Sequence, residues 1–293
     1  MKQRVWHFGP QDKPIDVIIE APHASYDKDE WMELRGRLEK LGVPASILDS
    51  LESLHKVKSD VGSGNIAQAI AAHLQTLWPN LRIAVLMGDF SRVVVDFNRL
   101  APGEGMTPPI PSEIQGEARK WLAAEHLKYL EEADALWGQL GPNGWGICPH
   151  TYAPRGVAIP DGMTAAQAAQ AFWSDTEAQE RSPLRSPVDI IWQRPDTDTF
   201  QHKRPKILDR IKRALEDALK VVATENKEFS MLEVVTADLR MAKHPGQVVC
   251  FKVRRDLVVD PHSGGWQPGE FMEPNLELCG QIGAAIARAF IEL

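Results

Sequence analysis

Short runs of β-branched and other apolar residues alternate along the chain with segments of helical periodicity, and this pattern constrains the fold most strongly. The candidate strands cover residues 15–21, 45–49, 82–87, 92–97, 145–148, 188–192, 230–235 and 247–253. The candidate helices cover residues 28–42, 63–77, 112–139, 164–174, 205–223 and 274–292. Continuous β-branched runs are typical of parallel strands buried on both faces. The alternation therefore predicts an α/β fold with a mixed, mostly parallel sheet flanked by helices.

The size of the chain fits this fold as one unit. It has 293 residues and is 43% hydrophobic, which is enough apolar material for a substantial core. Because no internal repeat and no convincing linker is visible, we expect a single domain over residues 1–293. Two stretches rich in Pro and Gly, at 101–111 and 151–163, are predicted loops and candidate walls or lids of a site.

Charge and cysteine usage narrow the class of partner. The net charge is −7, with 33 basic and 40 acidic residues, which argues against a general nucleic-acid or membrane-surface binder. No signal peptide is visible, and no run approaches the ~18 apolar residues of a membrane span. The three cysteines form no CxxC pair, so reduced thiols are expected. We therefore expect a cytoplasmic protein with a small-molecule partner, of unknown oligomeric state.

Polar residues of the kinds used in sites stand where predicted strands end or helices begin. They are His23 after 15–21, Asp60 before the helix at 63–77, Asp96, Asn98 and Arg99 at the end of 92–97, and His150 after 145–148. Parallel strands end along one edge of their sheet, so these side chains can converge.

Two histidines and one carboxylate are the usual protein ligands of a hydrolytic zinc, which leaves a fourth position to water or substrate. Such a zinc lowers the pKa of its water toward ~7 and polarises a substrate carbonyl. The planar fork of Arg99 suits a substrate carboxylate, and Asn98 adds a donor. Structural roles remain as alternatives, because histidines at strand ends often only support the fold and Asp60 could cap the next helix. Neither HExxH nor HxxE occurs.

The stretches "APHAS", "SRVVVDFNR" and "PHTYAP" together resemble the N-formylglutamate amidohydrolase family. That family is related in fold to the zinc carboxypeptidases, succinylglutamate desuccinylase and aspartoacylase. The late stretch "HPGQVVCFKVRRDLV" is similar to the family's penultimate strand. The resemblance covers most of the chain in the same order, and its most specific part is the DxNR motif.

The resemblance implies a phosphorylase/hydrolase-like α/β fold with one catalytic Zn²⁺ per chain. The metal positions carry over onto His23, Asp60 and His150. The substrate-carboxylate role carries over onto Arg99 with Asn98 beside it, and Asp96 is expected to orient Arg99 or a histidine. The implied activity is cleavage of the acyl amide of a small N-acyl amino acid such as N-formylglutamate.

The chain departs from the family on the late strand. Where the family has a glutamate as general base, the aligned residue is Lys252. An ammonium group accepts no proton from a zinc-bound water near neutral pH unless its pKa is strongly depressed. The alternative function is therefore a catalytically impaired family member that binds a carboxylate ligand. We also expect Lys252 to be paired with an acidic residue or a bound anion.

Three further residues match basic positions of the family less specifically. Arg254 and Arg255 correspond to basic residues of the late strand, and Arg254 is expected to face the site. His126 corresponds to a histidine of a family "PYH" motif, either as a substrate contact or as a packing residue. A serine hydrolase is disfavoured, because no GxSxG stretch occurs.

Overall fold

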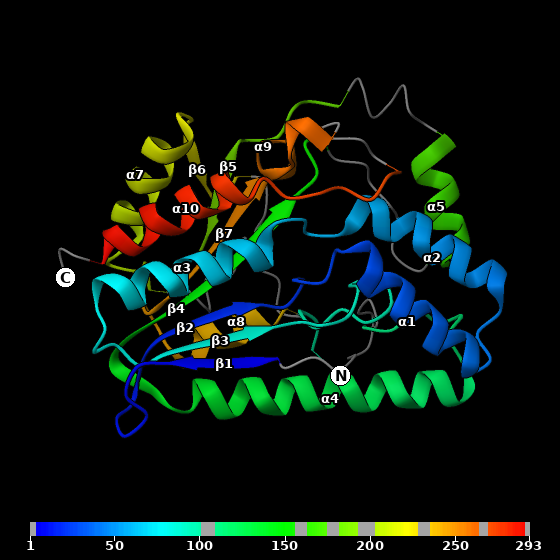
Figure 1. The fold of residues 1–293 in the computed structure, drawn as a ribbon, viewed down its shortest axis with the longest axis horizontal. Coiled ribbons are helices and arrows are strands. Elements are labelled where there is room, and N and C mark those ends of the chain that lie inside the picture. The colour runs from blue at the N-terminus through cyan, green and yellow to red at the C-terminus, as the bar shows by residue number, and fades with distance from the viewer. Residues whose placement is uncertain are drawn as a thin grey trace.

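In the part of the chain that the structure describes, seven strands form one mixed sheet with helices on both of its faces (Figure 1). The structure is a computed structural model, and it describes residues 4–100, 109–155, 163–174, 182–192, 203–227, 235–263 and 269–290. The strands are β1 (Val5–Phe8), β2 (Ile15–Ala21), β3 (Ile83–Met87), β4 (Leu140–Tyr152), β5 (Val188–Ile191), β6 (Ala223–Glu225) and β7 (Val248–Arg254). The helices are α1 (Lys28–Lys40), α2 (Ala45–Lys58), α3 (Ser63–Leu77), α4 (Gly116–Trp137), α5 (Ala165–Ser174), α7 (Leu208–Leu219), α8 (Thr236–Lys243), α9 (Arg255–Val258) and α10 (Leu276–Ala289).

The strand order is β1-β3-β2-β4-β7-β5-β6. Strands β3, β2, β4 and β7 run parallel, whereas β1 is antiparallel to β3 and β5 is antiparallel to β7. The chain passes from β2 to β3 on one side and then returns through α4 to β4 on the other side of β2. The carboxyl ends of β2 and β4 therefore flank the point where the winding reverses, which is where open α/β sheets build their sites.

Each face of the sheet carries its own apolar core, because successive strand residues point to opposite faces. Helices α3, α7 and α10 cover one face, where Val17 and Ile19 of β2 pack with Ile70 of α3 and Ile286 of α10. Helices α1, α2, α4, α5 and α8 contribute to the core on the other face. Figure 1 shows α3 and α10 side by side, and a Cβ at Gly283 would lie 2.5 Å from that of Ala69. The two helices can approach this closely only with glycine there.

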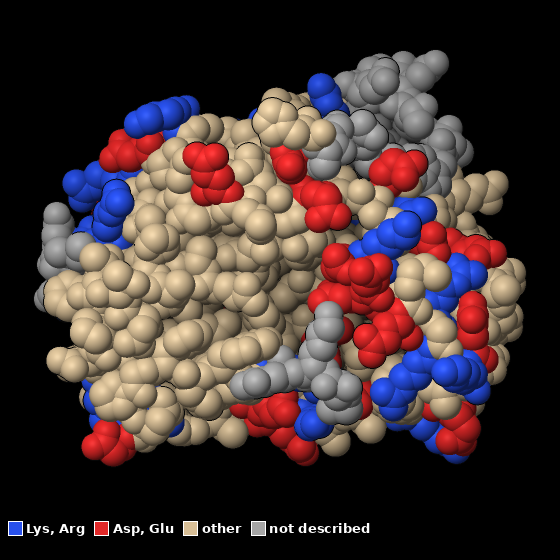
Figure 2. All heavy atoms as spheres, in the orientation of Figure 1, with Lys and Arg blue, Asp and Glu red and all other residues tan. Residues whose placement is uncertain are grey.

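Charged side chains are unevenly spread over the face seen in Figure 2. They gather over α1 and α2, whereas the part over α3 and α10 carries few of them. Among the described residues, no helix has the length and apolar character needed to cross a membrane.

The predicted fold class is confirmed, and β2 and α3 have the predicted bounds. Two predicted strands are wrong. Residues 45–49 begin α2, whose buried Leu48, Leu51 and Leu54 recur at helical spacing, and 92–97 is a series of turns anchored on Ser91. The predicted strand at 230–235 lies outside the described residues except for Val235, which bridges to Arg99. Most of the two predicted loops, 101–111 and 151–163, also lies outside the described residues. Four observed elements, β1, β6, α8 and α9, were not predicted.

Candidate metal and substrate site

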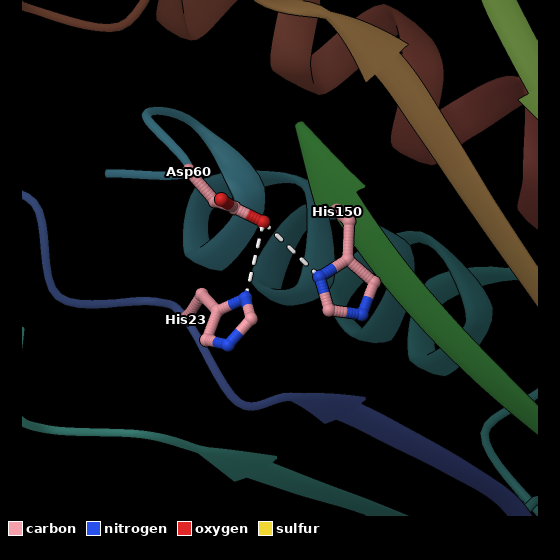
Figure 3. Close-up of side chains that lie close together, drawn as sticks. All are labelled: His23, Asp60 and His150. Carbon is pink, nitrogen blue, oxygen red and sulfur yellow. Dashed lines mark hydrogen bonds and ion pairs between the residues drawn. The ribbon is translucent and has the colours of Figure 1, made fainter. Parts of the chain in front are cut away.

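The structure brings together the side chains of His23, Asp60 and His150, from three separate parts of the sequence. One ligand atom from each lies within 4.8 Å of the others. Figure 3 shows both rings turned toward the carboxylate: Nδ1 of His23 lies 3.3 Å, and Nδ1 of His150 3.1 Å, from the same oxygen, Asp60 Oδ2. All three residues are at least 97% buried, with 2%, 1% and 3% exposure.

The fold delivers each of them from a strand end or a helix start. His23 stands on the turn after β2, and His150 lies two residues before the end of β4. Asp60 lies between α2 and α3, where its carbonyl accepts from Ser63 N at 3.0 Å. Asp60 is not the cap of α3, because the N-cap is Gly62, in the left-handed region at φ 85°. The alternative reading of Asp60 as a helix cap is therefore wrong.

The outer nitrogen of His23 is held by Asp96, whose Oδ1 lies 2.6 Å from His23 Nε2. Asp96 Oδ2 also lies 3.7 Å from Arg99 Nε. Burial acts to raise the pKa of Asp96, but His23 and Arg92 outweigh it and hold that pKa well below its usual range. An ionised carboxylate on the outer nitrogen orients the ring and makes a better ligand of Nδ1.

The protonation states of the other two residues suit a metal. Burial acts to raise the pKa of Asp60, but the charges of Arg92 and His23 keep it well below its usual value. Burial lowers the pKa of His150 to about 4, so its imidazole is neutral near pH 7. Two imidazole nitrogens and an ionised carboxylate around one buried point are the donor set of a zinc site with an open position, so these residues fit the metal.

Two arginines brace Asp60, and their role was not predicted. Arg92 Nη1 lies 2.8 Å from Asp60 Oδ1, the oxygen that the histidines do not use. Arg255 donates from Nη1 to the Val57 carbonyl at 2.6 Å and lies 4.0 Å from Asp60 Oδ1. Arg92 is part of the quoted "SRVVVDFNR" stretch, and its spacing of four residues from Asp96 was the signal available. Arg255 matched a basic position of the family's late strand, but its place beside Asp60 was not predicted, because its donor contacts are to main-chain carbonyls distant in sequence.

Lys252 lies on the site side of β7. Its register partners are His150 on β4 and Asp189 on β5, and partners in register share a face of the sheet. Burial, with the charge of Arg92, lowers the pKa of Lys252 to about 8, whereas the charge of Asp60 raises it. The charge of Lys252 in turn helps to lower the pKa of His150. A cation thus stands beside the proposed metal position.

Three other predicted residues, Arg99, Asn98 and His126, lie in or against the loop that follows Asp96. The Arg99 side chain is one-quarter exposed. His126 lies 2.8 Å through Nε2 from the Arg99 carbonyl and stacks on Phe97, so it supports the main chain of Arg99. Asn98 Oδ1 accepts from Thr236 Oγ1 at 2.9 Å, which joins this loop to the start of α8.

Arg254, expected to face the site, is engaged elsewhere. Its Nε lies 2.8 Å from Asp256 Oδ1, and its Nη1 donates to the Arg185 carbonyl at 2.9 Å. These contacts tie the end of β7 to the start of α9 and to the segment before β5. The structure therefore gives Arg254 a local pairing role at the end of β7.

No family model matches the chain, and no curated protein sequence matches it. Among solved structures, an N-formylglutamate amidohydrolase from Ralstonia eutropha JMP134 aligns with a TM-score of 0.51 and 14% identity, over 98% of this chain and 97% of that one. A gene product of Agrobacterium tumefaciens aligns with a TM-score of 0.55 and 15% identity, over 99% and 94%. This likeness shows the fold, which is the predicted hydrolase-like α/β architecture over nearly the whole length.

Proposed function

We propose that this chain is a zinc-dependent amidohydrolase that cleaves the acyl amide of a small N-acyl amino acid such as N-formylglutamate. The observation that carries the proposal is the convergence of His23 Nδ1 and His150 Nδ1 on one buried oxygen of Asp60. The shared fold with a solved N-formylglutamate amidohydrolase supports the same class of reaction.

Different side chains around this point would bind the metal and the substrate. His23, Asp60 and His150 would hold the zinc, which when bound supplies an activated water and polarises the substrate carbonyl. Asp96 accepts from His23 Nε2 and so keeps Nδ1 turned toward Asp60. Arg99, which is partly exposed at the end of the same loop, would bind the substrate carboxylate through its guanidinium fork.

A second function is favoured by one observation, the placement of Lys252 on the site side of β7. The family resemblance expects a proton acceptor at this position, and Lys252 is a poor one while it is charged. A cation there attracts a carboxylate but does not help to activate water. The second candidate is therefore a protein that binds a carboxylate ligand with little or no turnover.

Metal content and turnover together test both candidates. Purified wild-type protein is expected to hold about one zinc per chain, and the His23→Ala, His150→Ala double variant is expected to lose it. Stoichiometric zinc in the double variant would contradict the site. With N-formylglutamate, turnover supports the first function, whereas a ligand-induced rise in Tm without turnover supports the second. If N-formylglutamate gives neither turnover nor a rise in Tm, this substrate class is rejected.

A further inference from the structure

His55 of α2 makes three hydrogen-bond contacts although it is 1% exposed. Its Nδ1 lies 2.7 Å from Ser91 Oγ and 2.8 Å from Ser59 Oγ. Its Nε2 lies 3.1 Å from the main-chain carbonyl of Tyr26. The ring thus contacts the C-cap of its own helix, Ser59, and two segments that lie 29 and 36 residues away in sequence.

The partners determine which ring nitrogen carries the proton. A carbonyl oxygen only accepts, so Nε2 is the protonated nitrogen and donates to Tyr26, whereas Nδ1 accepts from the hydroxyl of Ser91. Ser59 Oγ also donates to the carbonyl of His55 itself, at 2.7 Å. Burial lowers the pKa of His55 to about 4, which keeps this neutral form near pH 7. The ring is stacked on Trp31 at 5.0 Å between centroids, so its plane is fixed as well.

Each joined segment carries a residue of the candidate metal centre. Tyr26 stands three residues after His23, and Ser59 directly precedes Asp60. Ser91 directly precedes Arg92, which contacts Asp60 Oδ1 at 2.8 Å. The Ser91 carbonyl also accepts from Val94 N and Val95 N, at 3.0 and 3.1 Å, and so shapes the turn that leads to Asp96. His55 therefore lies behind the site, at the point where its loops meet.

We propose that His55 is a positioning residue for the metal centre, holding the loops of His23, Asp60 and Arg92 in register. Its neutral imidazole bonds Tyr26 and Ser91, and Ser59 lies against the same ring and donates to the His55 carbonyl. This inference rests on the proposed zinc site. A residue that only filled the core would affect stability alone. A positioning residue affects zinc affinity beyond any loss of stability, because the ligands are then less preorganised.

Zinc affinity of the full chain, measured by competition with a chromophoric chelator, tests the proposal. His55→Phe keeps the stacked ring and removes both hydrogen bonds of the imidazole, so we expect zinc affinity to fall about 10-fold or more. His55→Asn places an acceptor near Nδ1 and is expected to recover part of that loss. Leu48→Ala, on the same helix, removes buried apolar contacts and leaves the hydrogen bonds of His55 in place. It should lower Tm and leave zinc affinity within about 2-fold.

Equal zinc affinity in His55→Phe and wild type would overturn the inference, as would an equal loss in Leu48→Ala. If the wild-type protein binds no zinc, the proposed function fails, and amide exchange in the metal-free chain then decides the role of His55. We expect faster exchange at Ser63, Val94 and Val95 in His55→Phe but not in Leu48→Ala. Unchanged exchange at these amides would overturn the inference independently of the metal.

Discussion

Arg92 Nη1 and Asp60 Oδ1 lie 2.8 Å apart, and this contact leaves Asp60 Oδ2 to the two histidines. One carboxylate thereby serves both a fixed cation and the proposed metal. The arrangement keeps Asp60 ionised in a position that water hardly reaches, since the residue is 1% exposed. If the proposed zinc binds, two cations, Arg92 and the metal, share the charge of one buried group.

Arg92→Gln is expected to destabilise the zinc-free protein by about 1–3 kcal/mol, because a buried carboxylate loses a charged donor. Added zinc should reduce this difference, since the metal then compensates Asp60. Urea unfolding with and without zinc measures both quantities. Arg35→Gln is a matched control: Arg35 pairs with Asp49 and Glu52 between α1 and α2, so its effect should not depend on zinc. A zinc-independent loss at Arg92 would argue against the shared carboxylate.

Asp96→Asn should lower zinc affinity about 10- to 100-fold, because a ligand histidine loses the charged group that orients it. Chelator competition gives the affinity directly. Glu20→Gln serves as the control. Glu20 is also buried, but it accepts from Trp137 Nε1 at 2.6 Å, a core residue, and not from a histidine of the site. It is expected to reduce stability while zinc affinity stays unchanged. A larger loss of zinc affinity in Glu20→Gln than in Asp96→Asn would contradict the role assigned to Asp96.

Arg99→Gln is expected to weaken binding of N-formylglutamate about 10- to 100-fold, which corresponds to the loss of one charge-assisted hydrogen-bonded pair. The loss should appear in KM or Kd more than in kcat, since the carboxylate is remote from the acyl group. Arg99→Lys keeps the charge without the planar fork and should give an intermediate value. Unaltered KM or Kd in Arg99→Gln would exclude Arg99 as the carboxylate site.

His55 predicts a pH dependence of folding stability. Its pKa is lowered from 6.5 to about 4, mainly by burial, with Lys56 and Arg255 adding to the effect and Glu52 opposing it. The stability that the neutral ring contributes is therefore complete above pH 6.5 and is lost as the pH falls toward 4. The total is about 3 kcal/mol, at about 1.4 kcal/mol per pKa unit. Subtracting the stability of His55→Asn at each pH isolates this contribution, and a difference independent of pH between 4 and 7 would contradict it.

The strand ends could be predicted because the apolar runs before them are continuous. Ile15–Ala21 is such a run, and the position of His23 follows from it directly. The helix at 45–58 was missed because "ASILD" reads equally well as a short strand, and only the leucines that follow reveal helical spacing. Short apolar runs remain ambiguous until their tertiary neighbours are known.

The cations around Asp60 could not be assigned from sequence for a different reason. Arg92 reaches Asp60 only because the predicted strand at 92–97 is in fact a series of turns. Arg255 reaches the same loop through a short helix after β7, and its contacts with Val57 and Lys58 span almost 200 residues of sequence. Neither periodicity nor motif spacing encodes such contacts. The three residues of the proposed metal site and Asp96, the partner of His23, were predicted from the sequence, whereas Arg92, Arg255 and His55 were not predicted as their supports.

Lys252 gives the most direct test of whether this site hydrolyses amides. It stands beside His150 in the β4–β7 register, on the site side of the sheet. Lys252→Glu replaces a cation by a proton acceptor within the site, and we expect amidase activity on N-formylglutamate to rise. A positioned general base typically contributes ~10²–10⁴-fold. Steady-state rates with saturating zinc measure the change.

Lys252→Gln separates the two effects that this substitution combines. Gln removes the positive charge but accepts no proton at neutral pH, so it reports only the relief of repulsion between the ammonium and the metal. If Glu exceeds Gln by a large factor, the missing base limits the wild-type protein. If both variants gain equally, charge repulsion is the cause. If Lys252→Glu is no faster than wild type, Lys252 does not occupy the position of the catalytic base. The second proposed function, a protein that binds a carboxylate ligand with little or no turnover, would then lose its main support.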